Sequence, residues 1–147
     1  MKYVIIAGVV VCFLMSCKGP AESGGCTPIA DPDKEMELVT PISGTFSVGS
    51  SVEVAWKVNP EEVDMVVIQV STSGLSGPWR DVYHDGIPVP RSGDLVCMDT
   101  VWAVGQEYAP VDYAETSTVL LRVGWYSHTS SAYDYAMDVS STITINK

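Results

Sequence analysis

Few residues of this chain combine the type and the spacing that catalysis needs. The two histidines, His84 and His128, belong to no spacing that binds zinc. His84 precedes Asp85, but no Gly-x-Ser-x-Gly nucleophile turn accompanies the pair, so no serine-hydrolase triad is predicted. The acidic residues of loop-like segments are interpreted as solvated charge: Glu61, Glu62, Asp112 and Glu115. We therefore predict a protein that is not an enzyme and that binds no metal and no cofactor.

Aromatic residues are the feature of the second half that suggests binding. The enriched set is Trp79, Tyr83, Tyr108, Tyr113, Trp125, Tyr126, Tyr133 and Tyr135. Aromatic rings in loops stack on sugar faces or fill a groove of a protein partner. The candidate ligand-binding residues are Tyr126, Tyr133, Tyr135 and Trp79, because the three tyrosines flank one polar loop. The alternative is that Trp79 and Trp125 are core residues and that the tyrosines pack at strand ends with their hydroxyls in water.

Length and charge limit the classes of protein that this chain can belong to. It has 147 residues, enough for one domain with a hydrophobic core. The formal net charge of −10 and the pI of about 4.3 argue against a nucleic-acid partner and against adhesion to anionic lipid through charge. Valine, isoleucine, threonine, serine and tyrosine dominate after the first sixteen residues, which is a strand-forming composition.

The N-terminus has the pattern of an export signal. A positive start at Lys2 precedes an apolar run over 3–15, which is short for a membrane span and typical of a signal peptide, here residues 1–16. The run ends in Leu-Met-Ser-Cys, which resembles the bacterial lipobox. That resemblance implies that Cys17 carries a thioether-linked diacylglycerol and becomes the first mature residue. Lys18 stands where an aspartate would, by resemblance, indicate inner-membrane retention. We therefore expect a protein lipid-anchored in the bacterial cell envelope, at the outer membrane or cell surface; the alternative is an ordinary secretory signal cut at another site.

Residues 17–35 hold the lipidated cysteine and a segment rich in glycine, proline and serine, which predicts a flexible tether. Cys12 leaves with the signal peptide and Cys17 carries lipid, so Cys26 and Cys97 remain. In an oxidising envelope two remaining cysteines suggest one disulfide. The alternative is two free thiols, with Cys97 buried as a small apolar residue.

The stretch 51–58 is the clearest strand. Its apolar residues alternate with polar ones, which indicates a half-buried β-strand with Trp56 anchoring the core. Further strands are expected over 36–40, 63–71, 79–83, 118–126 and 139–145, and no helix is expected. The runs 95–98 and 100–104 are expected as two strands or as one strand with a bulge. Seven to eight short antiparallel strands at regular spacing predict an all-β, immunoglobulin-like β-sandwich over residues 36–147.

A family resemblance points the same way. From Leu38 to Trp56 the chain has a proline, a glycine-bearing turn, an aromatic residue, Val-Gly and then a strand ending in tryptophan. This resembles the start of the Ig-like or fibronectin III-like domains of bacterial surface lipoproteins and cell-wall proteins, which are similar to the Ser/Thr-rich GPI-anchored cell-wall protein family. Residues 67–79, 121–123 and 138–145 resemble later strands. The resemblance implies an Ig-like fold and a role as a spacer, adhesion module or accessory part of a polysaccharide-handling system.

Two functions remain open at this point. The first is a membrane-anchored binding or adhesion module that contacts a cell-wall or extracellular glycan, or a protein, through loops 72–78 and 127–135. The second is a non-catalytic scaffold lipoprotein that recruits a protein partner by edge-strand or loop contacts.

Overall fold

Strands are the regular elements of this computed structural model, which describes residues 27–91, 94–126 and 138–147. In chain order they are β1 (Met36–Thr40), β2 (Gly44–Ser47), β3 (Ser51–Val58), β4 (Met65–Ser71), β5 (Arg80–Asp81), β6 (Ile87–Pro88), β7 (Val96–Ala103), β8 (Thr116–Tyr126), β9 (Asp138–Val139) and β10 (Ile143–Asn146). The all-β prediction is confirmed. Within the described ranges, no helix has the length and apolar character needed to cross a bilayer.

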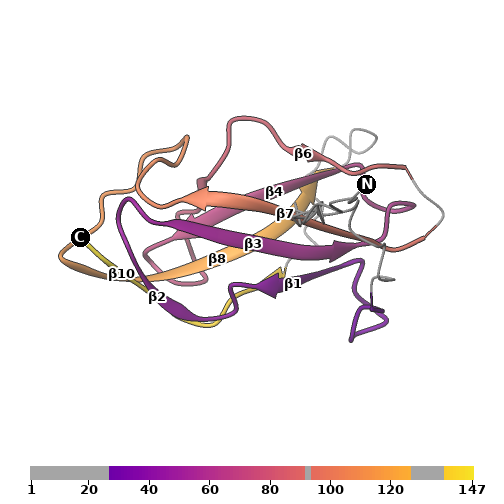
Figure 1. The fold of residues 1–147 in the computed structure, drawn as a ribbon, viewed down its shortest axis with the longest axis horizontal. Coiled ribbons are helices and arrows are strands. Elements are labelled where there is room, and N and C mark those ends of the chain that lie inside the picture. The colour runs from indigo at the N-terminus through magenta and orange to yellow at the C-terminus, as the bar shows by residue number, and fades with distance from the viewer. Residues whose placement is uncertain (1–26, 92–93, 127–137) are drawn as a thin grey trace, which may run out of the picture.

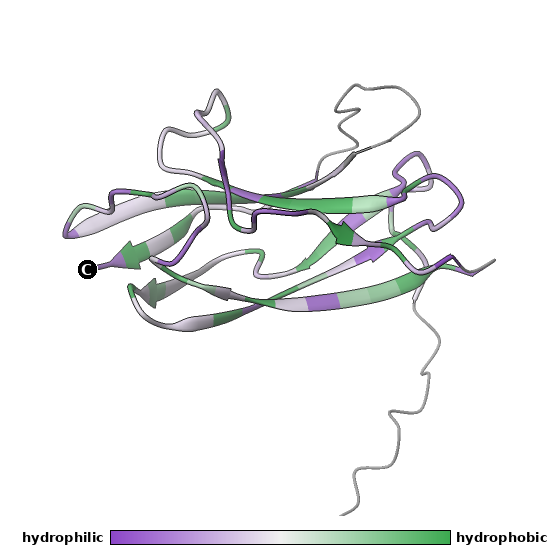
Figure 2. Cartoon of the chain, turned by 90° about the horizontal axis from the view of Figure 1, so that it is seen from above, coloured by the Kyte–Doolittle hydropathy of each residue, from purple (hydrophilic) through white to green (hydrophobic). Residues whose placement is uncertain are grey.

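The strands form two sheets that lie as two layers. One sheet has the order β1-β3-β7, and the other has the order β2-β10-β8-β4-β5 with β6 also paired to β4 and β9 to β8. The three-stranded sheet lies in front of β4 and β8 in Figure 1, and Figure 2 shows the two layers from above. All pairings are antiparallel except that of β2 with β10, which is parallel.

The core lies between the layers and follows from alternation along the strands. On β3, Val52, Val54, Trp56 and Val58 are buried while the residues between them are exposed or half-buried, as the sequence predicts. The opposite sheet contributes the buried residues Val66, Ile68, Val70, Val119, Leu121, Val123, Ile143 and Ile145. Trp56 is fully buried, so its predicted role as a core anchor is confirmed.

The strand count departs from the prediction of seven to eight antiparallel strands. The two runs expected over 95–98 and 100–104 are one strand, β7, whose register with β3 is unbroken. The expected last strand divides into β9 and β10 because Ser140 turns its polar groups onto β8: its backbone N–H donates to the Leu121 carbonyl and its Oγ accepts from the Leu121 N–H. Short β2 and β6 add further pairings, so ten strands are present in the described ranges.

The end of the predicted tether contacts the three-stranded sheet. The backbone N–H of Ala30 donates to Glu37 Oε2 at 2.9 Å. Lys57 Nζ donates to the Pro28 carbonyl at 3.2 Å and lies 3.3 Å from Glu37 Oε2. Glu37 and Lys57 are register partners on β1 and β3, and their side chains lie on the outer face of that sheet. Pro28 and Ala30 are therefore held against the outer face of the three-stranded sheet.

Candidate functional site

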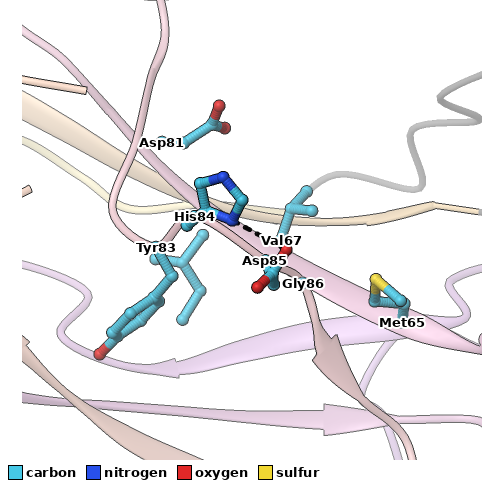
Figure 3. A pocket seen from close by; sticks show the side chains of 8 residues that line it. Met65, Val67, Asp81, Tyr83, His84, Asp85 and Gly86 are labelled. Atoms are coloured by element: carbon cyan, nitrogen blue, oxygen red, sulfur yellow. Dashed lines mark hydrogen bonds and ion pairs between the residues drawn. The ribbon is translucent and has the colours of Figure 1, made fainter. Parts of the chain in front are cut away.

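A hollow of about 170 Å³ opens beside β4 where its neighbouring strand is interrupted. β5 pairs with β4 at Gln69 and Val70, whereas β6 pairs with it at Met65 and Val66. The Val82 N–H still donates to the Ile68 carbonyl of β4, and residues 83–86 leave the sheet between these pairings. Figure 3 shows the side chains around the resulting space, which include Met65, Val67, Asp81, Tyr83, His84 and Asp85.

Close packing fixes the floor and one wall of the hollow. Gly86 contacts the Met65 side chain so closely that a Cβ at this position would overlap it. The Tyr83 hydroxyl donates to the Val101 carbonyl and lies 3.1 Å from Thr100 Oγ1, which ties the wall to β7. A larger residue at position 86 would therefore force the Met65 side chain to move.

A polar network connects Trp79 to this hollow. The Arg122 guanidinium carbon lies 4.1 Å from the centroid of the Trp79 ring, which is a cation–π contact. Arg122 Nε donates to Gln69 Oε1 at 2.7 Å, and Gln69 Nε2 donates to Asp81 Oδ1 at 2.6 Å. Arg122 and Gln69 are both buried, and such groups need partners of this kind to offset lost hydration. Trp79, Arg122, Gln69 and Asp81 therefore form one connected network on the outer side of β4 and β8, in which Trp79 and Asp81 are the half-buried members.

The structure places the two tryptophans of the core alternative differently. Trp125 packs against the core cluster, as that alternative expects. Trp79 is half-buried on the outer side of the sheet, with one ring face against Arg122 and its Nε1 donating to the Leu75 carbonyl at 3.3 Å. Trp79 therefore has a surface position that is compatible with ligand contact.

Several predicted site residues lie outside the described part of the chain. These are Cys17, Cys26, Tyr133 and Tyr135, together with the side chain of Tyr126. The tyrosine patch around one loop, the lipid attachment and the pairing of Cys26 with Cys97 all stay predictions.

Cys97 itself is described. It is an exposed residue of β7, so the alternative of a buried apolar cysteine is wrong. A groove on the outer face of the three-stranded sheet has both Thr27 and Cys97 in its lining. The residue that follows Cys26 therefore lies close to Cys97.

Glu107 is a buried residue that the sequence did not single out. Its Oε1 accepts hydrogen bonds from Trp102 Nε1 at 2.8 Å, the Gly105 N–H at 3.0 Å and the Tyr113 hydroxyl at 2.7 Å. Burial, with the hydrogen bond to Glu107 as a second cause, raises the pKa of Tyr113 above its ordinary value. The sequence analysis interprets Asp112 and Glu115 of the same segment as solvated charge, and nothing in the local pattern distinguishes Glu107 from such exposed acids.

The segment that follows Glu107 is hydrogen-bonded to residues that border the hollow. The Tyr108 N–H donates to the Val82 carbonyl at 3.0 Å, and the Ala109 N–H donates to the Asp81 carbonyl at 3.1 Å. The Tyr108 ring meets the His84 ring edge-on, with centroids 4.5 Å apart. Glu107 is thus a positioning residue for the strand that carries Asp81 and for the ring of His84.

Trp102 and Trp56 offer a matched test of the Glu107 cluster. Both side chains are fully buried, but Trp56 Nε1 has no hydrogen-bond partner among the described residues. Replacing either by phenylalanine removes a similar volume, whereas only Trp102→Phe also removes a donor from Glu107. We expect Trp102→Phe to cost about 1–3 kcal/mol more than Trp56→Phe in urea unfolding. Equal losses for the two variants would contradict a stabilising role for this hydrogen bond.

The chemistry that the hollow offers is recognition of a polar ligand. Asp81 and Asp85 supply hydrogen-bond acceptors, and Met65 and Val67 supply apolar surface beside them. His84 Nδ1 lies 2.9 Å from Asp85 Oδ1, and both side chains are largely exposed. Within the described residues, no group of three or more His, Cys, Asp or Glu side chains could hold a metal ion.

Comparison of the chain with protein-family models and with curated proteins finds no match.

Proposed function

We propose that this protein is a lipid-anchored lipoprotein of the bacterial cell envelope whose Ig-like domain binds a glycan. The anchor is Cys17, and the binding surface is the outer side of β4 and β8 with Trp79 and the hollow beside it. The predicted tyrosines of the neighbouring loop would extend this surface. The position in the envelope is the outer membrane or the cell surface.

The strand order supports the Ig-like part of the proposal. A sheet of β1, β3 and β7 faces a sheet in which β10, β8 and β4 are consecutive neighbours, as expected for the two sheets of an Ig-like domain. A tryptophan of β3 fills the space between the layers. The described domain from Met36 to Lys147 is also close to the length of about 100 residues that is usual for this fold.

The observation that carries the binding proposal is the separation of tether and hollow onto opposite faces. Lys57 holds Pro28 on the outer side of the three-stranded sheet. Gln69 and Arg122 lie on the outer side of the other sheet, with the core between. A domain attached through its first sheet leaves the hollow of its second sheet accessible to a ligand.

A scaffold that recruits a protein by strand addition is the second candidate, and β7 is the observation that favours it. This strand is eight residues long, is paired on one side by β3 and carries no bulge. Long, regular edge strands can pair with another chain. The Tyr83 hydroxyl already occupies the Val101 carbonyl on that edge, so an added strand would have to displace it or pair nearer Cys97.

The test is retention of the full chain, purified in detergent, on a panel of insoluble cell-wall polysaccharides. We expect binding to at least one polysaccharide, with a several-fold loss on Trp79→Ala or Tyr133→Ala because a stacking ring is removed. Val101→Ala is the control, since Val101 is exposed on the outer face of the other sheet. Failure to bind every polysaccharide would overturn the glycan proposal and favour the scaffold.

A further inference from the structure

The hollow beside β4 has an acidic rim and an apolar floor. The Asp81 carboxylate accepts one hydrogen bond, which Gln69 Nε2 donates to Oδ1. Asp85 is paired through its own Oδ1 with His84. The second oxygen of each carboxylate has no partner among the described residues, and no lysine or arginine of the described chain lines the hollow. Two acceptor oxygens with unused capacity therefore border a small space whose floor is Met65 and Val67.

This combination selects for a compact cation with apolar carbon surface. Carboxylates form their strongest hydrogen bonds with charged donors, and an ammonium group supplies several donors at once. The formal net charge of −10 adds a long-range attraction for cations. A neutral ligand would gain neither contribution.

An exposed ring beside the hollow favours a sugar chain as the source of that cation. Tyr108 is 57% exposed and meets His84 edge-on, so a face of its ring is available next to the rim. Sugar rings present C–H groups on their faces, and an aromatic side chain of this kind offers them apolar contact area. A sugar in the hollow could thus have a neighbouring sugar of the same chain on Tyr108.

We propose that the hollow binds the protonated amine of an amino sugar within a glycan, an inference that rests on the glycan-binding function above. Asp81 and Asp85 accept hydrogen bonds from the ammonium group, and Met65 and Val67 contact the sugar ring. N-acetylation would remove the charge, leave one N–H donor and add bulk that a hollow of about 170 Å³ has little room for.

The experiment compares a glucosamine hexamer with an N-acetylglucosamine hexamer by calorimetric titration of the full chain in detergent. We expect the glucosamine hexamer to bind at least about tenfold more tightly, and this preference to shrink as salt is raised. The Asp81→Asn and Asp85→Asn variants keep the side-chain shape and remove the charge, so each should reduce the preference. Asp99→Asn removes the same charge from the exposed face of β7 and should leave it unchanged.

Each other outcome overturns a defined part of the argument. Equal binding of the two hexamers, or a preference that survives Asp81→Asn and Asp85→Asn together, overturns the amine assignment and leaves glycan binding intact. Binding of another polysaccharide but of neither hexamer has the same meaning. Displacement of the glucosamine hexamer by a lower concentration of pentalysine would assign the hollow to a basic protein segment instead. Failure of every glycan would overturn the proposed function as well.

Discussion

Replacing Glu107 with alanine is expected to lower the free energy of unfolding by about 3–5 kcal/mol. Three donors converge on one carboxylate oxygen: Trp102 Nε1, the Gly105 N–H and the Tyr113 hydroxyl. All three side chains of the cluster are buried, so water cannot replace the lost acceptor without entering the core. A buried donor left without a partner costs about 1–3 kcal/mol, and this substitution leaves two such donors, Trp102 Nε1 and the Tyr113 hydroxyl, together with the part-buried Gly105 N–H.

Two matched variants test whether the loss comes from the buried acceptor at position 107. Glu107→Gln keeps an acceptor oxygen in the same place, so it should lose much less stability than Glu107→Ala. Glu115→Ala removes an exposed acid from the same segment and should change the midpoint of urea unfolding little. A loss below about 1 kcal/mol for Glu107→Ala would show that the cluster is not a major source of stability.

Glu107 also connects the stability of the domain to the geometry of the hollow. Glu107 fixes the segment whose Tyr108 and Ala109 N–H groups hold the carbonyls of Val82 and Asp81. The partly destabilised Glu107→Gln variant should therefore retain the fold, and any weakening of glycan binding in it reports a change in the position of Asp81. The Tyr108 and Ala109 hydrogen bonds are backbone interactions, which explains why no side-chain pattern in the sequence predicts them.

Strand existence was predictable where one face is buried and the other is not. The alternation of β3 requires one register, because a shift by one residue would place Trp56 in water and Glu53 in the core. The strands expected over 36–40, 63–71 and 118–126 correspond to β1, β4 and β8, and the strand expected over 79–83 contains β5. The sequence did not locate β2 and β6, because pairings of two to four residues contain too few positions to show a period.

The candidate site was less predictable than the fold for a physical reason. Trp79 was identified from its type, but its contact with Arg122 depends on β4, β5 and β8 lying side by side. Asp81, His84 and Asp85 looked like ordinary surface residues, because the interruption between β5 and β6 that creates the hollow is a property of pairing and not of local sequence.

Replacing Cys97 with serine is the second change for which we expect a large effect, a loss of about 4 kcal/mol of unfolding free energy. The expectation depends on the predicted pairing of Cys97 with Cys26. Thr27, the next residue after Cys26, lines the same groove as Cys97. Lys57 is the register partner of Cys97 on β3 and holds the carbonyl of Pro28. Thr27 and Pro28 therefore lie on the face of the three-stranded sheet that carries Cys97, which is compatible with the predicted bond.

The size of the expected loss follows from the conformational entropy of the unfolded chain. A bond between these residues closes a loop of about 70 residues, and in the chain-entropy model this removes about 4 kcal/mol of freedom from the unfolded state. Urea unfolding should give the same stability for Cys26→Ser, for Cys97→Ser and for the double variant, because each removes the same single bond. A reductant should lower the wild type to that level and leave Cys97→Ser unchanged. Additive losses in the double variant would contradict the pairing, and so would a wild type whose stability the reductant leaves unchanged.

If the pairing holds, the tether is covalently attached to the sheet opposite the hollow, so the lipid anchor and the proposed glycan surface are fixed on opposite sides of the domain.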